Sequence, residues 1–214
     1  MRSRGPSPFN RIEFRMKKNL LAAAVLCALT SGAAFAQQAE SPWLVRVRAV
    51  HLDSRNQDDT GLGLSINNKT IPEADISYFF TPNIAAELVL TYPQKHDVNA
   101  SALGGKIGTL KHLPPTLLAQ YHFTQFGGFK PYVGAGVNYT RFSNVDLPLG
   151  ARIDRNSWGP ALQLGVDIPL TRQLSLNFDV KKVYIKTDVT VPGVTSGSFK
   201  VDPVLVGVGL GWRF

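Results

Sequence analysis

The chain has 214 residues, a formal net charge of +8, one cysteine and a mean hydropathy close to zero. Residues 1–36 carry six Lys and Arg against one Glu, which gives +5 of that charge and leaves +3 for the remaining 178 residues. Because most of the basicity lies in the leading segment, the overall charge is no argument for nucleic-acid binding. A hydrophobic content of 44% excludes intrinsic disorder for most of the chain, and the length is that of one domain.

The leading segment has the pattern of a secretory signal. Lys17 and Lys18 precede an apolar run over residues 20–29, and Ala34-Phe35-Ala36 has the A-x-A form of a cleavage site. The apolar run is shorter than the roughly 20 residues that a transmembrane helix needs.

We therefore predict an over-extended start at residues 1–15, a signal peptide at 16–36 and a mature domain at 37–214. The only cysteine, Cys27, lies within the predicted signal, and the bulky Leu26 before it disfavours a lipoprotein anchor. The predicted mature chain consequently has no thiol for a disulfide, a zinc site or a nucleophile.

Segments of the mature chain alternate apolar and polar residues with a period of two, and none keeps the 3.6-residue spacing of a helix. In chain order, eight such segments cover residues 43–50, 73–80, 84–92, 116–123, 132–140, 158–168, 174–181 and 204–214. Short connections (81–83, 124–129 and 169–172) alternate with long polar ones (53–69, 93–112, 143–156 and 188–199). An even number of strands, with short turns on one side and long loops on the other, is typical of transmembrane barrels whose turns are periplasmic.

Alternation alone leaves two architectures open, a soluble lipocalin-like barrel with apolar residues inside and a transmembrane barrel with apolar residues outside. Seven glycines on the polar face suit the narrow interior of an eight-stranded barrel and favour the second. Aromatic residues near the strand ends of the apolar face resemble interfacial girdles. The predicted interfacial aromatics are Trp43, Tyr78, Tyr92, Tyr121, Tyr139, Trp158, Trp212 and Phe214. We predict an all-β fold, a closed eight-stranded antiparallel transmembrane β-barrel with short periplasmic turns and longer extracellular loops, in contact with outer-membrane lipids and lipopolysaccharide.

Three positions depart from the pattern. Pro160 lacks the amide that a central ladder needs, which predicts a bulge or the outer end of a strand. Pro114-Pro115 predicts the outer rim before the strand at 116–123. At Lys181-Lys182 the alternation slips, so we expect the seventh strand to leave the membrane or to bulge there.

The chain resembles the OmpW family of small outer-membrane porin-like proteins over nearly all of the mature region. The motifs that carry the resemblance are Asn83-Ile84, Glu87-Leu88, the segments 112–117 and 131–140, Ser157-Trp158-Gly159, Gly165-Val166-Asp167, Asp202-Pro203 and Trp212-Arg213-Phe214. The resemblance implies an eight-stranded barrel in the outer membrane of a Gram-negative bacterium. It implies that the barrel admits small hydrophobic molecules and releases them sideways through its wall, because its base is closed. The strand that ends in Phe214 also looks like the signal read by the barrel-assembly machinery.

The inward-facing residues agree with that expectation. Charged groups fall near the base and middle, where they must pair, since an isolated buried ion costs several kcal/mol. The predicted lumen charge plug consists of Arg46, Arg48, Asp75, Glu87, His122, Asp167, Asp179 and Arg213. The inward residues of the outer half are apolar, and those predicted to line the lumen are Val50, Val89, Leu118, Ala161 and Leu205. Lys181 either points inward, paired with Asp179 or Glu73, or outward toward lipopolysaccharide phosphates.

The sequence thus predicts a passive conduit for the uptake or exit of small hydrophobic molecules. The alternative is a structural or stress-related barrel whose extracellular loops act as a receptor or adhesin, without transport. An enzyme acting on membrane lipids would need a catalytic constellation that we cannot assemble, and we predict no enzyme activity, cofactor, metal site or nucleic-acid partner. The histidines His51, His96, His112 and His122 show no ligand spacing and are interpreted as rim or loop polarity, with His122 and Asp167 part of a structural network.

Overall fold

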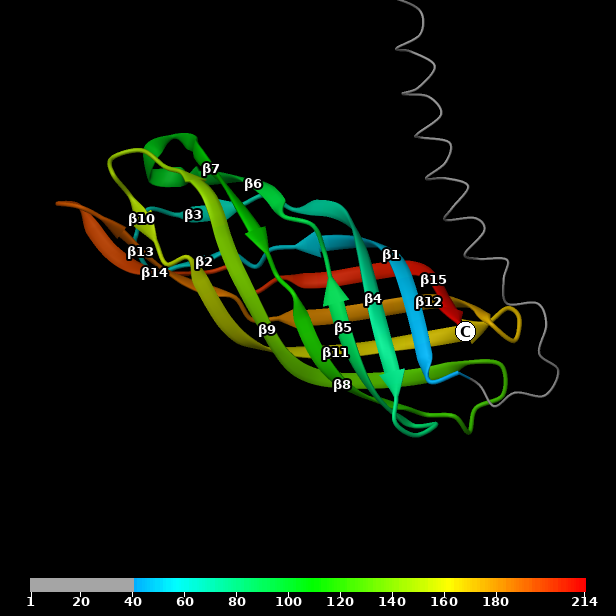
Figure 1. The fold of residues 1–214 in the computed structure, drawn as a ribbon. Coiled ribbons are helices and arrows are strands. Elements are labelled where there is room, and N and C mark those ends of the chain that lie inside the picture. The colour runs from blue at the N-terminus through cyan, green and yellow to red at the C-terminus, as the bar shows by residue number, and fades with distance from the viewer. Residues whose placement is uncertain (1–40) are drawn as a thin grey trace, which may run out of the picture. The chain divides into compact units, whose positions relative to one another are not determined.

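The computed structural model describes residues 41–214, which form a closed β-barrel with an extension at one end (Figure 1). The barrel strands are β1 (Trp43–Asp53), β4 (Lys69–Phe79), β5 (Ile84–Leu90), β8 (Thr116–His122), β9 (Lys130–Asp146), β11 (Asn156–Pro169), β12 (Leu174–Val183) and β15 (Val204–Arg213). They neighbour one another in the order β11-β12-β15-β1-β4-β5-β8-β9, and β11 also pairs with β9, which closes the ring. The predicted eight-stranded antiparallel barrel is confirmed. The predicted start, signal peptide and cleavage site lie outside the described residues.

The strands alternate between the two faces of the barrel wall, as the sequence pattern requires. On β1, Val47 is 59% exposed on the outer face, whereas its neighbours Arg46 and Arg48 are buried inside. A hydrocarbon environment rewards this arrangement, because apolar side chains can contact acyl chains while the closed ladder leaves no backbone edge unpaired. The ladder between β1 and β15, from Leu44↔Arg213 to Asp53↔Val204, joins the first strand to the last.

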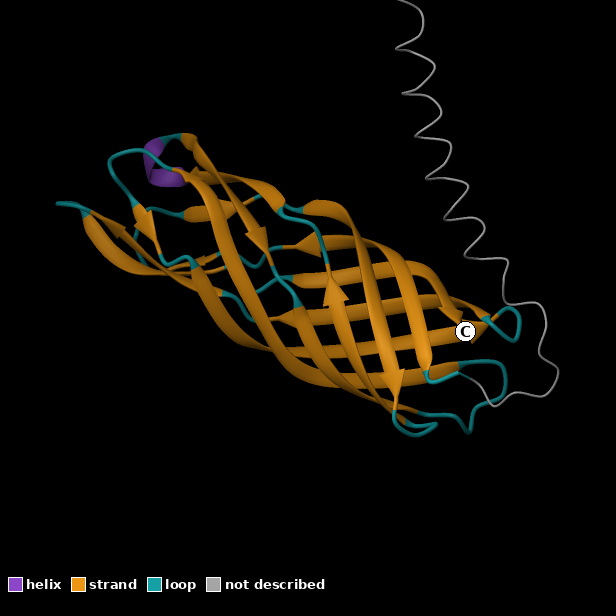
Figure 2. Ribbon diagram, in the orientation of Figure 1, coloured by secondary structure: helices purple, strands orange, loops and turns teal. Residues whose placement is uncertain are grey.

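Beyond the barrel, the segments predicted as long polar loops form further strands, so that part of the prediction is wrong. The strands β3 (Leu64–Ile66), β6 (Gln94–Ala100) and β7 (Gly105–Leu113) prolong the barrel sheet, whereas β2 (Gln57–Asp58), β10 (Arg152–Ile153), β13 (Lys186–Val191) and β14 (Thr195–Lys200) form a second sheet. Figure 2 shows that a short helix, η1 (Ser101–Leu103), lies in this extension, away from the barrel. Among residues 41–214, no helix is long and apolar enough to cross a membrane.

The extension reverses the polarity of the wall. Its apolar side chains point inward, as Ile66, Val98, Leu110, Val189 and Phe199 do, and all five are buried. The outward positions of its strands are polar, for example Lys186, Asp188 and Thr190 on β13. This is the pattern of a soluble barrel, and it follows from water rather than lipid on the outside.

The same reversal explains the apparent slip at Lys181-Lys182. Burial alternates without a break from Lys181 through Val183 and Ile185, so no bulge occurs there. What changes is which face is apolar, because Val183 and Ile185 are buried inside while Tyr184 is exposed. Of the two expectations for this position, departure from the membrane is the one that fits the burial pattern.

Two proline sites mark interruptions in the ladders. The carbonyl of Pro160 accepts a hydrogen bond from the amide of Tyr184, just beyond β12, so the missing amide of Pro160 faces the end of the β11–β12 ladder. Pro114 and Pro115 join β7 to β8 and are not at the outer rim, because β7 continues the wall beyond them. The expectation of a rim at this point is therefore wrong, since the extension was not foreseen.

Exposed aromatic residues lie near both ends of the barrel wall. At the end with the short turns, Trp43 contacts Tyr78, and Tyr78 contacts Phe80, with ring centroids 4.7 and 5.1 Å apart. At the end that joins the extension, Tyr139 contacts Trp158 at 4.7 Å. The predicted interfacial aromatics Tyr92, Tyr121, Trp212 and Phe214 are also at least partly exposed.

The reversal of polarity can be tested with one charge placed at two heights. We expect Val47→Arg to destabilise the barrel by about 2–4 kcal/mol, because Val47 lies on the outer face far from either strand end. The matched variant Thr190→Arg, on the outer face of β13, should change the stability little. The measurement is the free energy of folding into lipid vesicles; equal effects of both substitutions would contradict the assignment of lipid and water to the two heights.

Candidate functional site

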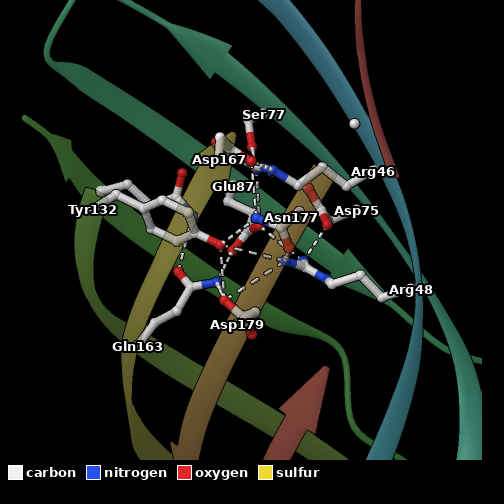
Figure 3. Close-up of polar contacts among 12 residues, drawn as sticks. Arg46, Arg48, Asp75, Ser77, Glu87, Tyr132, Gln163, Asp167, Asn177 and Asp179 are labelled. Carbon is white, nitrogen blue, oxygen red and sulfur yellow. Dashed lines mark hydrogen bonds and ion pairs between the residues drawn. The ribbon is translucent and has the colours of Figure 1, made fainter. Parts of the chain in front are cut away.

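Charged side chains fill the interior of the barrel at its middle and base. We call this group the interior charge cluster; its members are Arg46 and Arg48 on β1, Glu73 and Asp75 on β4, Glu87 on β5, Asp167 on β11, and Asp179 and Lys181 on β12. Figure 3 shows most of these side chains converging from different strands. Each faces inward because the period-two alternation of its strand places it there.

Arg46 connects β1 to three other strands. Its guanidinium forms a bidentate pair with Asp167, with Nε 3.2 Å from Oδ1 and Nη2 2.7 Å from Oδ2. Its remaining nitrogen, Nη1, lies 3.3 Å from Asp75, 3.4 Å from Glu87 and 3.1 Å from the Ser77 hydroxyl. The planar fork of arginine suits this role, since it can serve several carboxylates at once.

Arg48 lies one inward position further along β1 and shares carboxylates with Arg46. It donates to Glu73 at 3.1 Å and to Glu87 at 3.2 Å, and it also pairs with Asp75. The Asn177 side chain accepts a further bond from Arg48 at 2.9 Å. Asp75 and Glu87 therefore bridge the two arginines, and the cluster is one continuous network.

Lys181 points inward and is buried, which decides between its two interpretations. Its ammonium lies 2.7 Å from Glu73 and 2.6 Å from Asp179. The lysine forms the edge of the cluster nearest the extension. The apolar part of the interior therefore begins directly above an ammonium group that is paired with two carboxylates. The sequence pattern predicted both Glu73 and Asp179 as possible partners of an inward-pointing Lys181.

Uncharged polar side chains complete the cluster. Tyr132 donates to Asp179 at 2.9 Å, and Gln163 donates to both Glu87 and Asp179 at 2.8 Å. Tyr132 lies over Gly165, where a methyl group would overlap its phenol ring, so this glycine makes room for the tyrosine. Sequence reasoning placed Glu73 inward but omitted it from the plug, and it gave no role to Tyr132, Gln163 or Asn177. The period-two pattern places these residues at inward positions, and this was the one indication of their role that the sequence offered.

Two predicted members of the charge plug lie below the cluster. The His122 ring contacts the rings of Phe79 and Tyr132, with centroids 4.8 and 4.9 Å away, and one of its nitrogens lies 3.0 Å from the Gln120 side chain. The guanidinium of Arg213 lies over the Phe79 ring and donates to the Ser41 carbonyl. They form a floor beneath the cluster.

Above the cluster, the interior becomes apolar. The five predicted lining residues, Val50, Val89, Leu118, Ala161 and Leu205, are all buried and belong to one continuous hydrophobic core that extends to the tip of the extension. Val89 and Leu205, with Glu73 and Lys181, line a small cavity of about 20 Å³, which we call the inner cavity.

A second cavity, of about 60 Å³, lies within the extension, and we call it the outer cavity. Apart from Thr187, every residue that lines it is an apolar side chain or a proline. Three of these residues, Leu103, Leu149 and Val194, are 49%, 64% and 63% exposed, so the apolar lining continues to the outer surface.

Two histidines lie between the cavities. His96 on β6 and His112 on β7 stack with centroids 4.5 Å apart and are almost fully buried. Burial, together with the neighbouring His96 and the Lys69 ammonium, lowers the pKa of His112 to about 3, and burial lowers the pKa of His96 as well. The interpretation of this pair as rim or loop polarity is wrong, because both rings face inward in strands. Within residues 41–214, no group of three or more His, Cys, Asp or Glu side chains could hold a metal ion.

Comparisons with known proteins agree with this architecture. Residues 44–214 match the model of the OmpW family. The chain is 44% identical over 185 residues to the uncharacterized outer-membrane protein y4mB of Sinorhizobium fredii, covering 81% of this chain and 80% of that protein. It is 34% identical over 218 residues to outer membrane protein W of Escherichia coli, covering 93% and 100%. The crystal structure of the outer membrane protein OprG from Pseudomonas aeruginosa superposes with a TM-score of 0.71 at 28% identity, covering 82% of this chain and 97% of that one.

The interior charge cluster predicts a large effect for loss of one arginine. We expect Arg46→Leu to destabilise the barrel by about 3–5 kcal/mol, because Asp167 and its neighbours would stay buried without their cation. Arg141→Leu, at an exposed position of β9, is the matched control and should have little effect. Urea unfolding in lipid vesicles measures both; a small change for Arg46→Leu would show that the cluster contributes little to stability.

The buried histidine pair predicts a loss of stability at low pH. Folding lowers the pKa of His112 from its ordinary value near 6.5 to about 3, so the unfolded chain binds a proton that the folded chain does not. Above pH 6.5 His112 is neutral in both the folded and the unfolded chain, so it does not make the stability depend on pH. As the pH falls from 6.5 toward 3, the free energy of unfolding decreases by up to about 1.4 kcal/mol per pH unit. Between pH 7 and pH 4, His112→Phe should therefore lose about 3 kcal/mol less stability than the parent. The control His51→Phe should lose as much as the parent, and so would His112→Phe if this account were wrong.

Proposed function

Because this chain belongs to the OmpW family, an outer-membrane β-barrel family and not an enzyme family, we propose that it is a passive channel for small apolar molecules. It is an outer-membrane barrel of a Gram-negative bacterium. In this proposal the solute enters at the tip of the extension and is held in the apolar interior. The interior charge cluster closes the way to the periplasm.

The observation that carries the proposal is the arrangement of the interior along the barrel axis. The outer cavity has an apolar lining that reaches the surface at Leu103, Leu149 and Val194. The inner cavity follows, and beneath it lies the cluster around Lys181 and Glu73. Apolar surface exposed to water at the mouth favours capture of apolar solutes, since each square ångström removed from water stabilises the bound state.

The cluster disfavours an open aqueous pore. The arginine, lysine and carboxylate groups use one another as partners, and an eight-stranded barrel has room for little beyond its own side chains. An ion or a hydrophilic solute would have to break these pairs to pass, and each unpaired buried charge costs several kcal/mol. We therefore infer that the solute leaves the barrel above the cluster.

An interruption in the barrel wall offers an exit at that height. The β4–β5 ladder ends at Ala74↔Leu90 and the β5–β8 ladder at Val89↔Thr116. The residues that follow, 91–93 and 114–115, belong to no strand, and three of them are prolines without an amide to donate. Thr91, Pro114 and Thr116 line the inner cavity, so this interruption supports release sideways into the bilayer.

The outer surface suggests the remaining partners. The exposed aromatics at both ends of the wall would lie at the two membrane interfaces, in contact with outer-membrane lipids and lipopolysaccharide. The C-terminal strand that ends in Phe214 would serve the barrel-assembly machinery as its recognition signal.

The proposal predicts that the interior can be blocked at its apolar level. Leu118→Asp places a charge among buried apolar groups, and Ala161→Phe fills the same level with a ring. We expect each to slow the uptake of a hydrophobic test compound at least severalfold in cells that lack the parental protein. The volume-conserving Leu118→Met should retain the parental rate.

Uptake of a hydrophilic solute should be the same for all these cells, and the shift of the folded barrel on unheated gels checks that each variant folds. If a folded Leu118→Asp or Ala161→Phe variant supports parental uptake, these residues do not line the path. If the parental protein itself gives no increase over cells without it, the channel proposal is wrong.

A further inference from the structure

Polar atoms without partners are concentrated at one place in the interior. In the part of the chain that the structure describes, six buried side-chain nitrogen and oxygen atoms have no hydrogen-bond partner. Five of them belong to four residues: Thr91 Oγ1, Gln94 Oε1, His96 Nε2, and both Nδ1 and Nε2 of His112. Buried polar groups in proteins are nearly always paired, so such a concentration requires an explanation. We call these four residues the polar station.

The polar station lies between the two cavities. Gln94 and His112 face each other across the β6–β7 ladder, and the His96 ring stacks on that of His112. Thr91 and His112 line the inner cavity. The next inward residues of the same ladder, Val98 and Leu110, line the outer cavity. A molecule that moves from one cavity to the other passes these polar atoms.

The hydrogen bonds that are made fix the chemistry of those that are not. His96 Nδ1 lies 3.0 Å from the Asn67 carbonyl, which can only accept, so Nδ1 carries the proton and Nε2 is an acceptor. The Gln94 amide nitrogen donates to the Tyr92 carbonyl at 2.9 Å, which leaves Oε1 as an acceptor. Neutral His112 offers one acceptor and one donor, and the Thr91 hydroxyl can do either. The station therefore offers more acceptors than donors.

This inventory discriminates between classes of ligand. An alkane would leave every one of these atoms unpaired. A carboxylate could only accept, and the station has few donors; the nearby Lys69 ammonium donates to the Lys95 carbonyl at the surface. A metal ion is excluded by geometry, because the imidazole planes lie 12° from parallel in a stack and in-plane lone pairs cannot converge on one ion. A hydroxyl group donates one hydrogen bond and accepts others, which matches the station.

We propose that the polar station binds the hydroxyl group of an uncharged amphipathic molecule, a long-chain or aromatic alcohol, whose apolar body extends along the outer cavity toward its exposed apolar mouth. The inference rests on the proposed channel function and names the class of solute that the channel prefers. A hydroxyl in the station satisfies Gln94 Oε1 and a histidine nitrogen in the same step, whereas the hydrocarbon remains in contact with Val98 and Leu110.

Nitrogen NMR of the histidine rings tests binding directly. The protein is labelled with ¹⁵N-histidine, purified and placed in lipid nanodiscs, and it is then titrated separately with 1-decanol, n-decane and decanoate. We expect 1-decanol to shift the signals of His96 Nε2 and the His112 nitrogens and to leave those of exposed His51 unchanged. Because n-decane makes no hydrogen bond, it should not produce the shift at the His96 and His112 nitrogens. This measurement needs no substitution, so it does not depend on whether a variant folds.

Substitutions then assign the effect to the station. Gln94→Met with His112→Phe keeps the side-chain volumes and removes two hydrogen-bonding groups, so the affinity for 1-decanol should fall about tenfold. His51→Phe is the matched control, because that histidine bonds to Thr70 on the outside of the barrel, and it should bind 1-decanol as the parent does. In uptake assays the ratio of the 1-decanol rate to the n-decane rate should be lower for the double variant than for the parent.

Each contrary result has a defined meaning. If 1-decanol leaves the histidine signals unchanged, the station holds water only and the inference is wrong. Tighter binding of decanoate, or equal affinity of the parent and the double variant, also overturns it. If parental cells take up neither compound faster than cells without the protein, the channel function fails. The NMR titration still decides, independently, whether the station binds an alcohol.

Discussion

The structure depends on one constraint: the outer face of the wall contacts lipid along the barrel and water along the extension. In the barrel the outer face is apolar and the inside must hold the polar residues, so Arg46 and Arg48 are buried opposite carboxylates. In the extension the outside is polar and the inside becomes an ordinary hydrophobic core, with Val98 and Phe199 among its members. The interior charge cluster and the apolar cavities are two results of this exchange. The proposed channel uses the boundary between them.

Much of the fold could be predicted from the sequence because a lipid-facing strand has a strong period-two pattern. The eight segments read in this way all became barrel strands. The extension was missed because its strands are short and polar on the outside, so segments such as 93–112 resemble loops. The apparent irregularity at Lys181-Lys182 was a sign of the boundary, since the apolar residues change faces there while the backbone continues regularly.

The interior was predictable in composition but not in detail. The sequence pattern placed Arg46, Asp167 and Asp179 in one interior group, because buried charges in a barrel are stable only when they are paired. It could not reveal that Tyr132 folds over Gly165 to reach Asp179, which depends on the shapes of two neighbouring strands. The His96–His112 pair was missed because its members lie on paired strands and not at a short spacing within one helix.

The Arg46–Asp167 contact has a consequence for how the barrel is built. The two residues are 121 positions apart in the chain and meet only across the lumen of a completed ring. A half-assembled sheet of β1, β4 and β5 would leave Arg46 without Asp167, and it would present the charged inner face of these strands to hydrocarbon. Intermediates of that kind are strongly disfavoured, so strand-by-strand insertion is the least accessible order of events. The charged inner face of the nascent sheet therefore has to stay beside water or a helper protein until the last hairpins arrive.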